Sequence, residues 1–382
     1  MRMKSWFDAF AIAREVAAPL PGQTIPVAEA GGQVLASPII CVRPVPAFDN
    51  AAMDGFATCG PGPWTVTGLL LAGGFTALPS LSPGEAIEIA TGAPVPVGTT
   101  AVLPYEDATV AGRRVSGVLG ERTHVRRAGE TLAAGALVSP AGRIVTATLA
   151  GATVQAGVDV VTTVRPPTVT LLVTGDEVIS DGVPGPGQVR DTFTGLVTAL
   201  TLRAGGVLRE RRHQKDDPVS LAAALDDTDA EVVVVSGSSS AGAADHLHTV
   251  LTDRGATWHV RGVACRPGHP QALAELPGGR WVVSLPGNPF AGLIAGLTLL
   301  EPLLETMAGR PCHPLPTAAV TGSTTLMRGG VRIVPVVHSP QGTRIAADRG
   351  SAGLHAVALA DALAVLPDDW TPGTPARLLA IP

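Results

Sequence analysis

The stretch TVTLLVTGDE, residues Thr168 to Glu177, joins an uninterrupted run of β-branched and apolar residues to a glycine and two carboxylates. Such a run is typical of a strand that is buried on both faces of a parallel sheet. Two further runs of this kind, each followed by a glycine-containing loop, occur at residues 231–242 and 281–289. Because the carboxyl ends of parallel strands share one edge of a sheet, the pattern predicts a site for an anionic, phosphate-bearing ligand there.

Helical segments separate these strands. Asp191 can cap a helix that ends near Ala204, and Asp217 precedes a proline at the first position of the next helix. Asn288 begins a long helix towards Met307, and residues 5–18 and 243–253 are also predicted to be helical. The alternation predicts a three-layer α/β domain with a mainly parallel sheet.

The flanking regions have a different character. From residue 25 to about 164, short β-branched runs are separated by glycine and proline turns, which indicates small β-rich modules. Past Pro311 the chain is again β-like, with strands expected at 332–337, 343–346, 362–366 and 376–379. We therefore expect a multidomain α/β protein with β-rich N-terminal modules and a small C-terminal β-domain.

The overall composition argues against several classes of function. The formal net charge of the 382 residues is -5, so neither nucleic acid nor an anionic membrane is an expected partner. The cysteines are widely separated, which predicts no zinc site and no disulfide framework. The N-terminus lacks an apolar signal-peptide core, and the apolar run from Phe290 to Leu300 is too short to span a bilayer. These features predict a soluble cytoplasmic protein.

The three strand-end loops contain the candidate ligand-binding residues. Glycines there would let the backbone approach a ligand, and free N–H groups at the following helix could hold phosphate. Any one loop alone could equally be an ordinary turn, but three in register favour a site. The predicted binding residues in these loops are Thr174, Gly175, Ser236, Gly237, Ser240, Pro286, Gly287, Asn288 and Pro289.

Acidic side chains follow the same strands. Asp176, Glu177, Asp216 and Asp245 are not explained as helix caps, and carboxylates beside a phosphate site usually hold Mg²⁺. The alternative is that they are solvated loop residues. In the loop Cys265 to Pro270, Arg266 could bind an oxyanion through two N–H groups. His269 could be a weaker ligand or a plain turn residue.

Several motifs together resemble one family. PVPAFDNAAMDGFA (44–57), IATGAPVPVGTTAV (89–102), VRRAGE (125–130), LLVTGDEV (171–178), KDDP (215–218) and SLPGNPFAG (284–292) occur in this order. They resemble the molybdopterin molybdenumtransferases, a family that includes the C-terminal part of gephyrin. The resemblance covers nearly the whole chain, and the first and last motifs are the most specific.

The resemblance implies a function in molybdenum cofactor biosynthesis: Mg²⁺-dependent insertion of molybdate into adenylylated molybdopterin with release of AMP. Molybdate and tungstate remain alternatives. It also implies an elongated homodimer, with the molybdopterin adenylyltransferase and molybdoenzyme chaperones as candidate partners. The implied domains are 1–44 with 136–165 for elongation and dimerisation, 45–135 contributing to the partner's active site, 166–309 binding molybdopterin, and 310–382 at the C-terminus.

Site residues carry over by motif. The resemblance implies Asp54, Glu177, Asp216 and Asp245 as catalytic and metal-binding carboxylates, with Asp54 supplied by the other subunit. Thr91 and Gly92 join the binding residues, and Arg261, Arg266 and His269 stand where the family has lysines. These changes, with Ser238, Thr131 and Phe193 at other motif positions, favour an alternative: a non-catalytic molybdopterin carrier or assembly protein. A third possibility is an unrelated Mg²⁺-dependent nucleotide hydrolase.

Overall fold

The central sheet of the computed structural model has six strands in the order β17-β14-β18-β22-β21-β19. The first four are parallel, and the register of β21 makes it antiparallel to both of its neighbours. The strands are β14 (Thr168–Thr174), β17 (Val207–Gln214), β18 (Val232–Ser236), β19 (Thr257–Arg261), β21 (Ala272–Leu276) and β22 (Arg280–Leu285). The structure describes residues 3–73, 77–237, 246–346 and 353–382.

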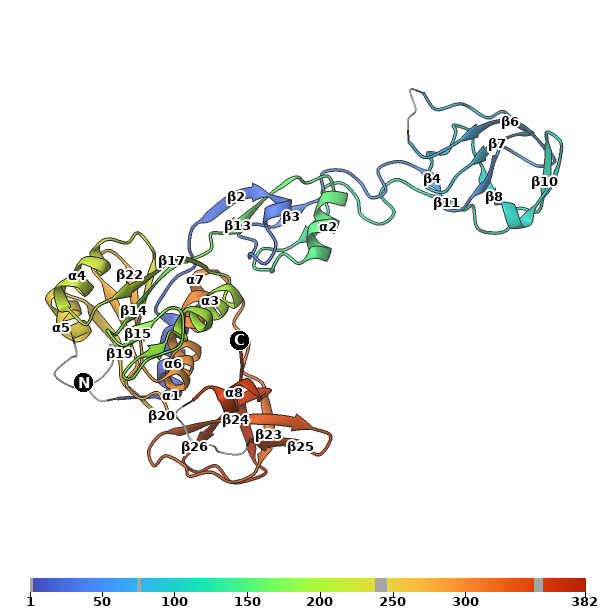
Figure 1. Cartoon of the computed structure of the whole chain (residues 1–382). Coiled ribbons are helices and arrows are strands. Elements are labelled where there is room, and N and C mark those ends of the chain that lie inside the picture. The colour runs from blue at the N-terminus through green and yellow to red at the C-terminus, as the bar shows by residue number, and fades with distance from the viewer. Residues whose placement is uncertain (1–2, 74–76, 238–245, 347–352) are drawn as a thin grey trace.

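The two faces of this sheet carry separate apolar cores. Leu171 and Val173 of β14 join one core, whereas Leu172 between them joins the other. This alternation is what the two-residue period of a strand dictates, and it explains why the strand reads as a continuous apolar run. Helices cover both faces (Figure 1), so the predicted three-layer α/β arrangement is confirmed.

Two helices begin where the capping residues predict, whereas the helix Phe193–Arg203 has Thr192 at its N-cap, and Asp191, one residue before it, accepts hydrogen bonds from the Phe193 and Thr194 N–H groups. Asp217 accepts a hydrogen bond from the Ser220 N–H at 2.7 Å, and Asn288 accepts one from the Ala291 N–H at 3.0 Å. The helices of this domain are α1 (Trp6–Glu15), α3 (Phe193–Arg203), α4 (Pro218–Asp226), α5 (His246–Asp253), α6 (Pro289–Ala295), the π-helical segment η3 (Gly296–Leu300) and α7 (Glu301–Met307).

The helical run from Pro289 to Met307 extends beyond its apolar stretch. With 19 residues it is long and apolar enough to cross a membrane by length and composition, whereas the sequence predicted a run too short to do so. The structure nevertheless buries 83% of its most apolar window against the rest of the chain. This burial is that of a core helix.

Helix α1 packs on the α/β domain although it lies at the start of the chain. Trp6 is fully buried, and its indole N–H donates a hydrogen bond of 3.0 Å to the Thr298 hydroxyl. Strand β1 (Lys4–Ser5) pairs with β20 (Val263–Arg266). The division into domains remains a prediction, but this packing differs from the predicted grouping of residues 1–44. The amphipathic pattern of α1 shows that one face is buried without showing what covers it.

Two β-rich modules extend from the α/β domain in Figure 1. The nearer module, which we call the arm, contains β2 (Gly22–Pro26), η1 (Val27–Glu29), β3 (Ile39–Ile40), β12 (Leu137–Ser139), α2 (Ala147–Gln155) and β13 (Val160–Val164). The farther module, the tip, contains β4 (Asn50–Ala51), β5 (Gly55–Thr58), β6 (Trp64–Leu70), β7 (Glu85–Ile89), β8 (Ala101–Pro104), η2 (Tyr105–Asp107), β9 (Ala108–Ala111), β10 (Arg114–Gly117) and β11 (Val125–Arg126). The tip sheet has the order β8-β5-β7-β6-β10-β9.

The C-terminal strands close into a small barrel. Strand β24 pairs with β25, and pairings continue through β23, β27 and β26 back to β24. These elements are β23 (Thr317–Thr321), β24 (Val331–Ser339), β25 (Gly342–Ile345), α8 (His355–Ala358), β26 (Ala362–Pro367) and β27 (Pro375–Ala380). Strand β20 also pairs with β24, which joins this barrel to the α/β domain. That pairing and β23 were not predicted.

Replacement of Gly292 by alanine should destabilise the α/β domain. A Cβ atom at Gly292 would lie 2.2 Å from Cε1 of Phe193, so α3 and α6 would have to move apart. We expect a loss of about 1–3 kcal/mol in the free energy of unfolding, measured by denaturant titration. Gly195→Ala in α3 is the matched control, because no atom lies within 4 Å of its added Cβ. That change should stabilise by about 0.5–1 kcal/mol, and equal effects of the two substitutions would contradict the packing argument.

Candidate functional site

The three predicted loops lie side by side at the carboxyl edge of the central sheet. Val173 pairs with Ser236, and Ser236 pairs with Leu285, so the strands end in register. The Thr174 hydroxyl donates a hydrogen bond of 2.6 Å to the Ser236 carbonyl, and the Gly237 N–H donates one of 3.0 Å to the Leu285 carbonyl. The structure therefore brings Thr174, Ser236 and Gly237 together with the loop that begins after Leu285.

Glycine is required at the centre of this edge. Gly237 has φ of +89°, and a Cβ there would lie 2.9 Å from the Thr174 hydroxyl oxygen. A Cβ on Gly287 would lie 3.5 Å from the Gly237 Cα. Gly175 has φ of +123°, and its Cβ would lie 2.7 Å from a Glu177 carboxylate oxygen. The loops are thus packed backbone to backbone, which leaves little side-chain bulk between the sheet edge and a ligand.

Two of the predicted carboxylates meet at the same edge. Strand β17 ends at Gln214 opposite Thr174, so Asp216 leaves the sheet beside Glu177. The pKa of Asp216 is raised by its partial removal from water and then by the negative charges of Glu177 and Asp176. Asp176 therefore belongs to this acidic cluster together with Glu177 and Asp216. A bound cation would relieve the repulsion between these carboxylates.

The predicted basic residues lie at the same side of the sheet. Arg261 ends β19, and the register through Ala272 to Ser284 places it beside the end of β22. Its guanidinium lies over the Trp258 ring, 5.6 Å from the centroid. A Cβ on Gly268 would lie 3.2 Å from the Ala291 carbonyl oxygen, so the loop that carries Arg266 and His269 packs on the first turn of α6.

Asp54 lies in the tip, away from this edge. Its Oδ1 accepts hydrogen bonds from the Thr91 N–H at 2.6 Å and the Thr91 hydroxyl at 2.9 Å. These bonds, the backbone one first, hold the pKa of the Asp54 carboxyl below its usual value. Gly92 follows with φ of +80°. Within one chain, the structure separates Asp54 and Thr91 from Glu177 and Asp216 (Figure 1).

The predicted metal-binding set is not assembled within the part of the chain that the structure describes. Among those residues, no group of three or more His, Cys, Asp or Glu side chains could hold a metal ion. Asp245 and Ser240 lie outside the described residues, and Asp54 lies in the other module. A complete set of Asp54, Glu177, Asp216 and Asp245 therefore stays a prediction.

His213 was not predicted as a site residue. It lies on β17, and its Nε2 is 2.8 Å from the Gly175 carbonyl oxygen, so it supports the first glycine loop. Its place just before the Lys215-Asp216 motif was the available signal.

In the tip, Arg127 contacts Asp49 at 2.6 Å, and the Ala128 N–H donates to the same carboxylate at 2.8 Å. These two contacts join the motif at 44–57 to the motif at 125–130.

Two family models match most of the chain. Residues 4–157 match the family model described as MoeA N-terminal region (domain I and II), and residues 170–306 match the one described as probable molybdopterin binding domain. Molybdopterin molybdenumtransferase 2 of Mycobacterium tuberculosis is 33% identical over 332 residues, which cover 80% of each chain.

The chain belongs to the molybdopterin molybdenumtransferase family.

Other members of the family support this assignment. The molybdopterin molybdenumtransferase of Haemophilus influenzae is 30% identical over 310 residues, covering 76% of this chain and 75% of that one. The molybdopterin biosynthesis MoeA protein of Pyrococcus horikoshii shares the fold over the full length of both chains, with a TM-score of 0.80 at 22% identity. The predicted family and fold class are confirmed, as are molybdenum cofactor biosynthesis and the class of transferase.

The acidic cluster should make the stability of the protein depend on pH. Because the folded state raises the pKa of Asp216, its contribution to stability is present below the unfolded pKa and is lost as pH rises through the folded pKa. Asp216→Asn should therefore raise the free energy of unfolding of the metal-free protein near neutral pH. The gain should be at most about 1 kcal/mol because the carboxyl is exposed.

Thermal unfolding of both proteins between about pH 8 and pH 4 would measure this effect. The difference between Asp216→Asn and the unmodified protein should shrink as pH falls. Asp217→Asn is the matched control, since asparagine also caps a helix and the neighbouring charge is removed. A gain of the same size from both substitutions, or one that does not vary with pH, would contradict the repulsion argument.

Proposed function

We propose that the chain inserts molybdenum from molybdate into adenylylated molybdopterin in a Mg²⁺-dependent reaction that releases AMP. The observation that carries the proposal is the meeting of Glu177 and Asp216 beside three glycine-containing loops at one sheet edge. Phosphate chemistry needs a backbone cradle and a means of balancing negative charge, and this edge offers both. The names of the related proteins support the choice of molybdopterin as substrate.

The residues present fit Mg²⁺. They supply carboxylate oxygens, which this ion prefers, and the pKa of Asp216 is raised by partial burial and by the charges of Glu177 and Asp176, which His246 offsets only in part. Glu177 and Asp216 would hold the ion, joined by Asp245 and by Asp54 of the other subunit. Bound there, Mg²⁺ would neutralise charge on the phosphate oxygens of the adenylate.

The remaining residues would bind and orient the substrates. The backbone at Gly175 and Gly237, with the N-terminus of α6 after Asn288, would take up phosphate. Arg261 and Arg266 carry planar guanidinium groups suited to an oxyanion, and both lie on the α6 side of the site. Thr91 holds the Asp54 carboxylate through Oδ1, which fixes the direction in which Oδ2 is presented.

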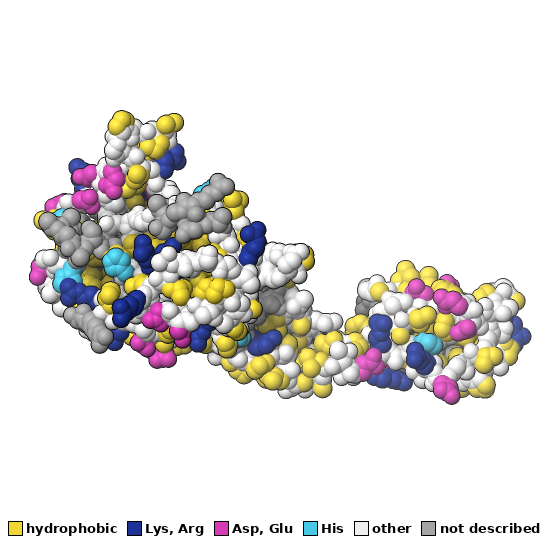
Figure 2. All heavy atoms as spheres, turned by 90° about the horizontal axis from the view of Figure 1, so that it is seen from below, with side chains coloured by type: hydrophobic (Ala, Val, Ile, Leu, Met, Phe, Trp, Pro, Cys, Tyr) yellow, Lys and Arg dark blue, Asp and Glu magenta, His cyan; other side chains and the backbone are white. Residues whose placement is uncertain are grey.

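A homodimer would complete this site. Exposed apolar side chains gather on the arm, where Figure 2 shows hydrophobic atoms along the slim part of the chain. They include Ile40, Val42, Leu137, Val154 and Val160, each 45–64% exposed. Exposed apolar patches of this kind commonly form the interface of a two-fold symmetric dimer. Pairing through the arm would carry the tip of one subunit towards the α/β domain of its partner.

We further propose that the protein works in the cytoplasm. The molybdopterin adenylyltransferase would supply its substrate there, and molybdoenzyme chaperones would receive its product.

A non-catalytic carrier is the second candidate function. It is favoured by Phe193, which stands where the family usually has asparagine and which is buried against Gly292 rather than facing a ligand. The carboxylate cluster opposes it, because a carrier has no need to concentrate negative charge beside a phosphate.

Release of AMP from adenylylated molybdopterin distinguishes the two candidates. With molybdate and Mg²⁺ present, we expect AMP and active cofactor to form, and a chelator should stop both. Asp216→Asn should lower kcat/KM on the order of a hundredfold, since it removes a charge that acts on the reacting phosphate. Asp217→Asn, which changes only a helix cap, should leave the rate unchanged. Binding of the substrate without release of AMP would favour the carrier.

Mixed dimers test whether two subunits share the site. In a random mixture of Asp54→Ala and Asp216→Ala chains, half of the dimers are mixed, and each of these has one site with both carboxylates. Activity should therefore return to about a quarter of the wild-type value. A mixture of Asp54→Ala with Asp54→Asn chains is the control and should stay inactive. If the first mixture also stays inactive while dimers form, both carboxylates act within one chain.

A further inference from the structure

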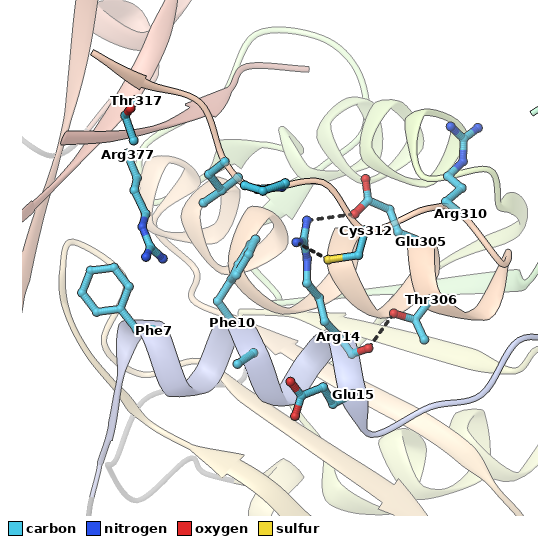
Figure 3. A pocket seen from close by; sticks show the side chains of 13 residues that line it. Phe7, Phe10, Arg14, Glu15, Glu305, Thr306, Arg310, Cys312, Thr317 and Arg377 are labelled. Atoms are coloured by element: carbon cyan, nitrogen blue, oxygen red, sulfur yellow. Dashed lines mark hydrogen bonds and ion pairs between the residues drawn. The ribbon is translucent and has the colours of Figure 1, made fainter. Parts of the chain in front are cut away.

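A cavity lies far from the carboxylate cluster. It has a volume of about 600 Å³ and is formed where α1, the end of α7, the connector from 310 to 317 and β27 meet (Figure 3). The helical run that starts beside Asn288 at the sheet edge reaches this cavity at Thr306. At a rise of 1.5 Å per residue, the 19 residues of this run separate the two places by roughly 28 Å.

Aromatic rings and guanidinium groups face each other in this cavity. The Arg377 guanidinium lies 4.8 Å from the centroid of the Phe7 ring, and that of Arg14 lies 4.6 Å from the Phe10 ring. Figure 3 shows Arg377 pointing from β27 towards Phe7, with Phe10 rising from α1 on the side towards Arg14. Phe7 is the exposed ring of the two, whereas Phe10 is 9% exposed and also stacks on Trp6, with 5.1 Å between the ring centroids.

The two arginines differ in the hydrogen bonds and ion pairs that their guanidinium groups form. Arg14 donates to the Cys312 sulfur at 2.9 Å and to the His313 carbonyl at 3.1 Å, and it pairs with Glu305 at 3.5 Å. Arg377 forms no ion pair with any residue that the structure describes, and its stacking on Phe7 leaves the N–H edge of the guanidinium unused. Arg377 is thus able to receive an anion.

The charge of the cavity also favours an anion. Three arginines, Arg14, Arg310 and Arg377, line it against two carboxylates, Glu15 and Glu305. Burial, and then the negative charge of Glu301, raise the pKa of Glu305. Phe7 is 37% exposed, so its ring can be reached from the cavity.

We propose that this cavity binds a small organic anion whose flat aromatic body lies against Phe7 and whose carboxylate pairs with Arg377. The cavity volume is in the range of small-molecule sites, and its position at a junction between domains is a common one for them. A ligand there touches α1, the connector and β27 together, so it would hold the C-terminal barrel against the α/β domain. The site is additional to the proposed molybdenum insertion and does not depend on it.

Calorimetric titration of the full-length protein tests this assignment with three probes. Indoleacetate carries both the ring and the carboxylate, indoleacetamide has the same ring without the charge, and acetate has the charge without the ring. Indoleacetate should bind at least tenfold more tightly than either of the others, because only it satisfies both parts of the site. Equal binding of indoleacetate and indoleacetamide would overturn the proposal.

Substitutions then locate the binding. Arg377→Gln should weaken indoleacetate about tenfold, as expected for loss of a charged partner, and Phe7→Leu should weaken it while keeping an apolar side chain. The matched control is Arg344→Gln, an exposed arginine on β25 of the same barrel that does not line the cavity. Affinities that are equal in Arg377→Gln and Arg344→Gln, with thermal unfolding unchanged, would contradict the site. Because molybdopterin takes no part, a negative result leaves the proposed insertion untouched.

Discussion

The in-register pairing of β14, β18 and β22 is the interaction on which the remaining structure depends. Each strand is buried on both faces, so a slip by one residue would exchange the two apolar cores and place every side chain on the wrong face. The same register makes the three strands end together. The meeting of three glycine-containing loops is therefore a consequence of core packing and needs no separate force to hold it.

Local features of the sequence were sufficient to predict this part of the molecule. The apolar run before Gly175 predicts a buried strand, and Asp217 and Asn288 mark helix starts that their hydrogen bonds confirm. Long-range contacts were beyond such reasoning. Nothing near Trp6 indicates that its partner is Thr298, and nothing near Arg266 indicates that β20 pairs with β24. A pattern shows that a face is buried, but the covering element is decided by the whole chain.

The same limit applies to the candidate site. Glu177 and Asp216 follow neighbouring strands, so their meeting could be predicted from topology, and the pKa of Asp216 is consistent with it. His213 was missed because its edge strand shows no continuous apolar run, and its place just before the Lys215-Asp216 motif was the only sequence signal that we identify for it. Asp54 is held by Thr91 within the tip, so its carboxylate is oriented before any partner approaches. Such preorganisation lets two separately folded modules contribute to one centre.

The packing of α1 also has a consequence for the order in which the chain folds during synthesis. The hydroxyl that accepts the hydrogen bond of the Trp6 indole belongs to a residue 292 positions later in the chain. At usual rates of translation, about 15–60 s pass before that partner emerges from the ribosome. Meanwhile the arm and the tip, whose strands pair within residues 22–164, are complete. During this time the apolar face of α1 lacks the elements that cover it in the folded protein. Chaperones that bind nascent chains are therefore expected to recognise it.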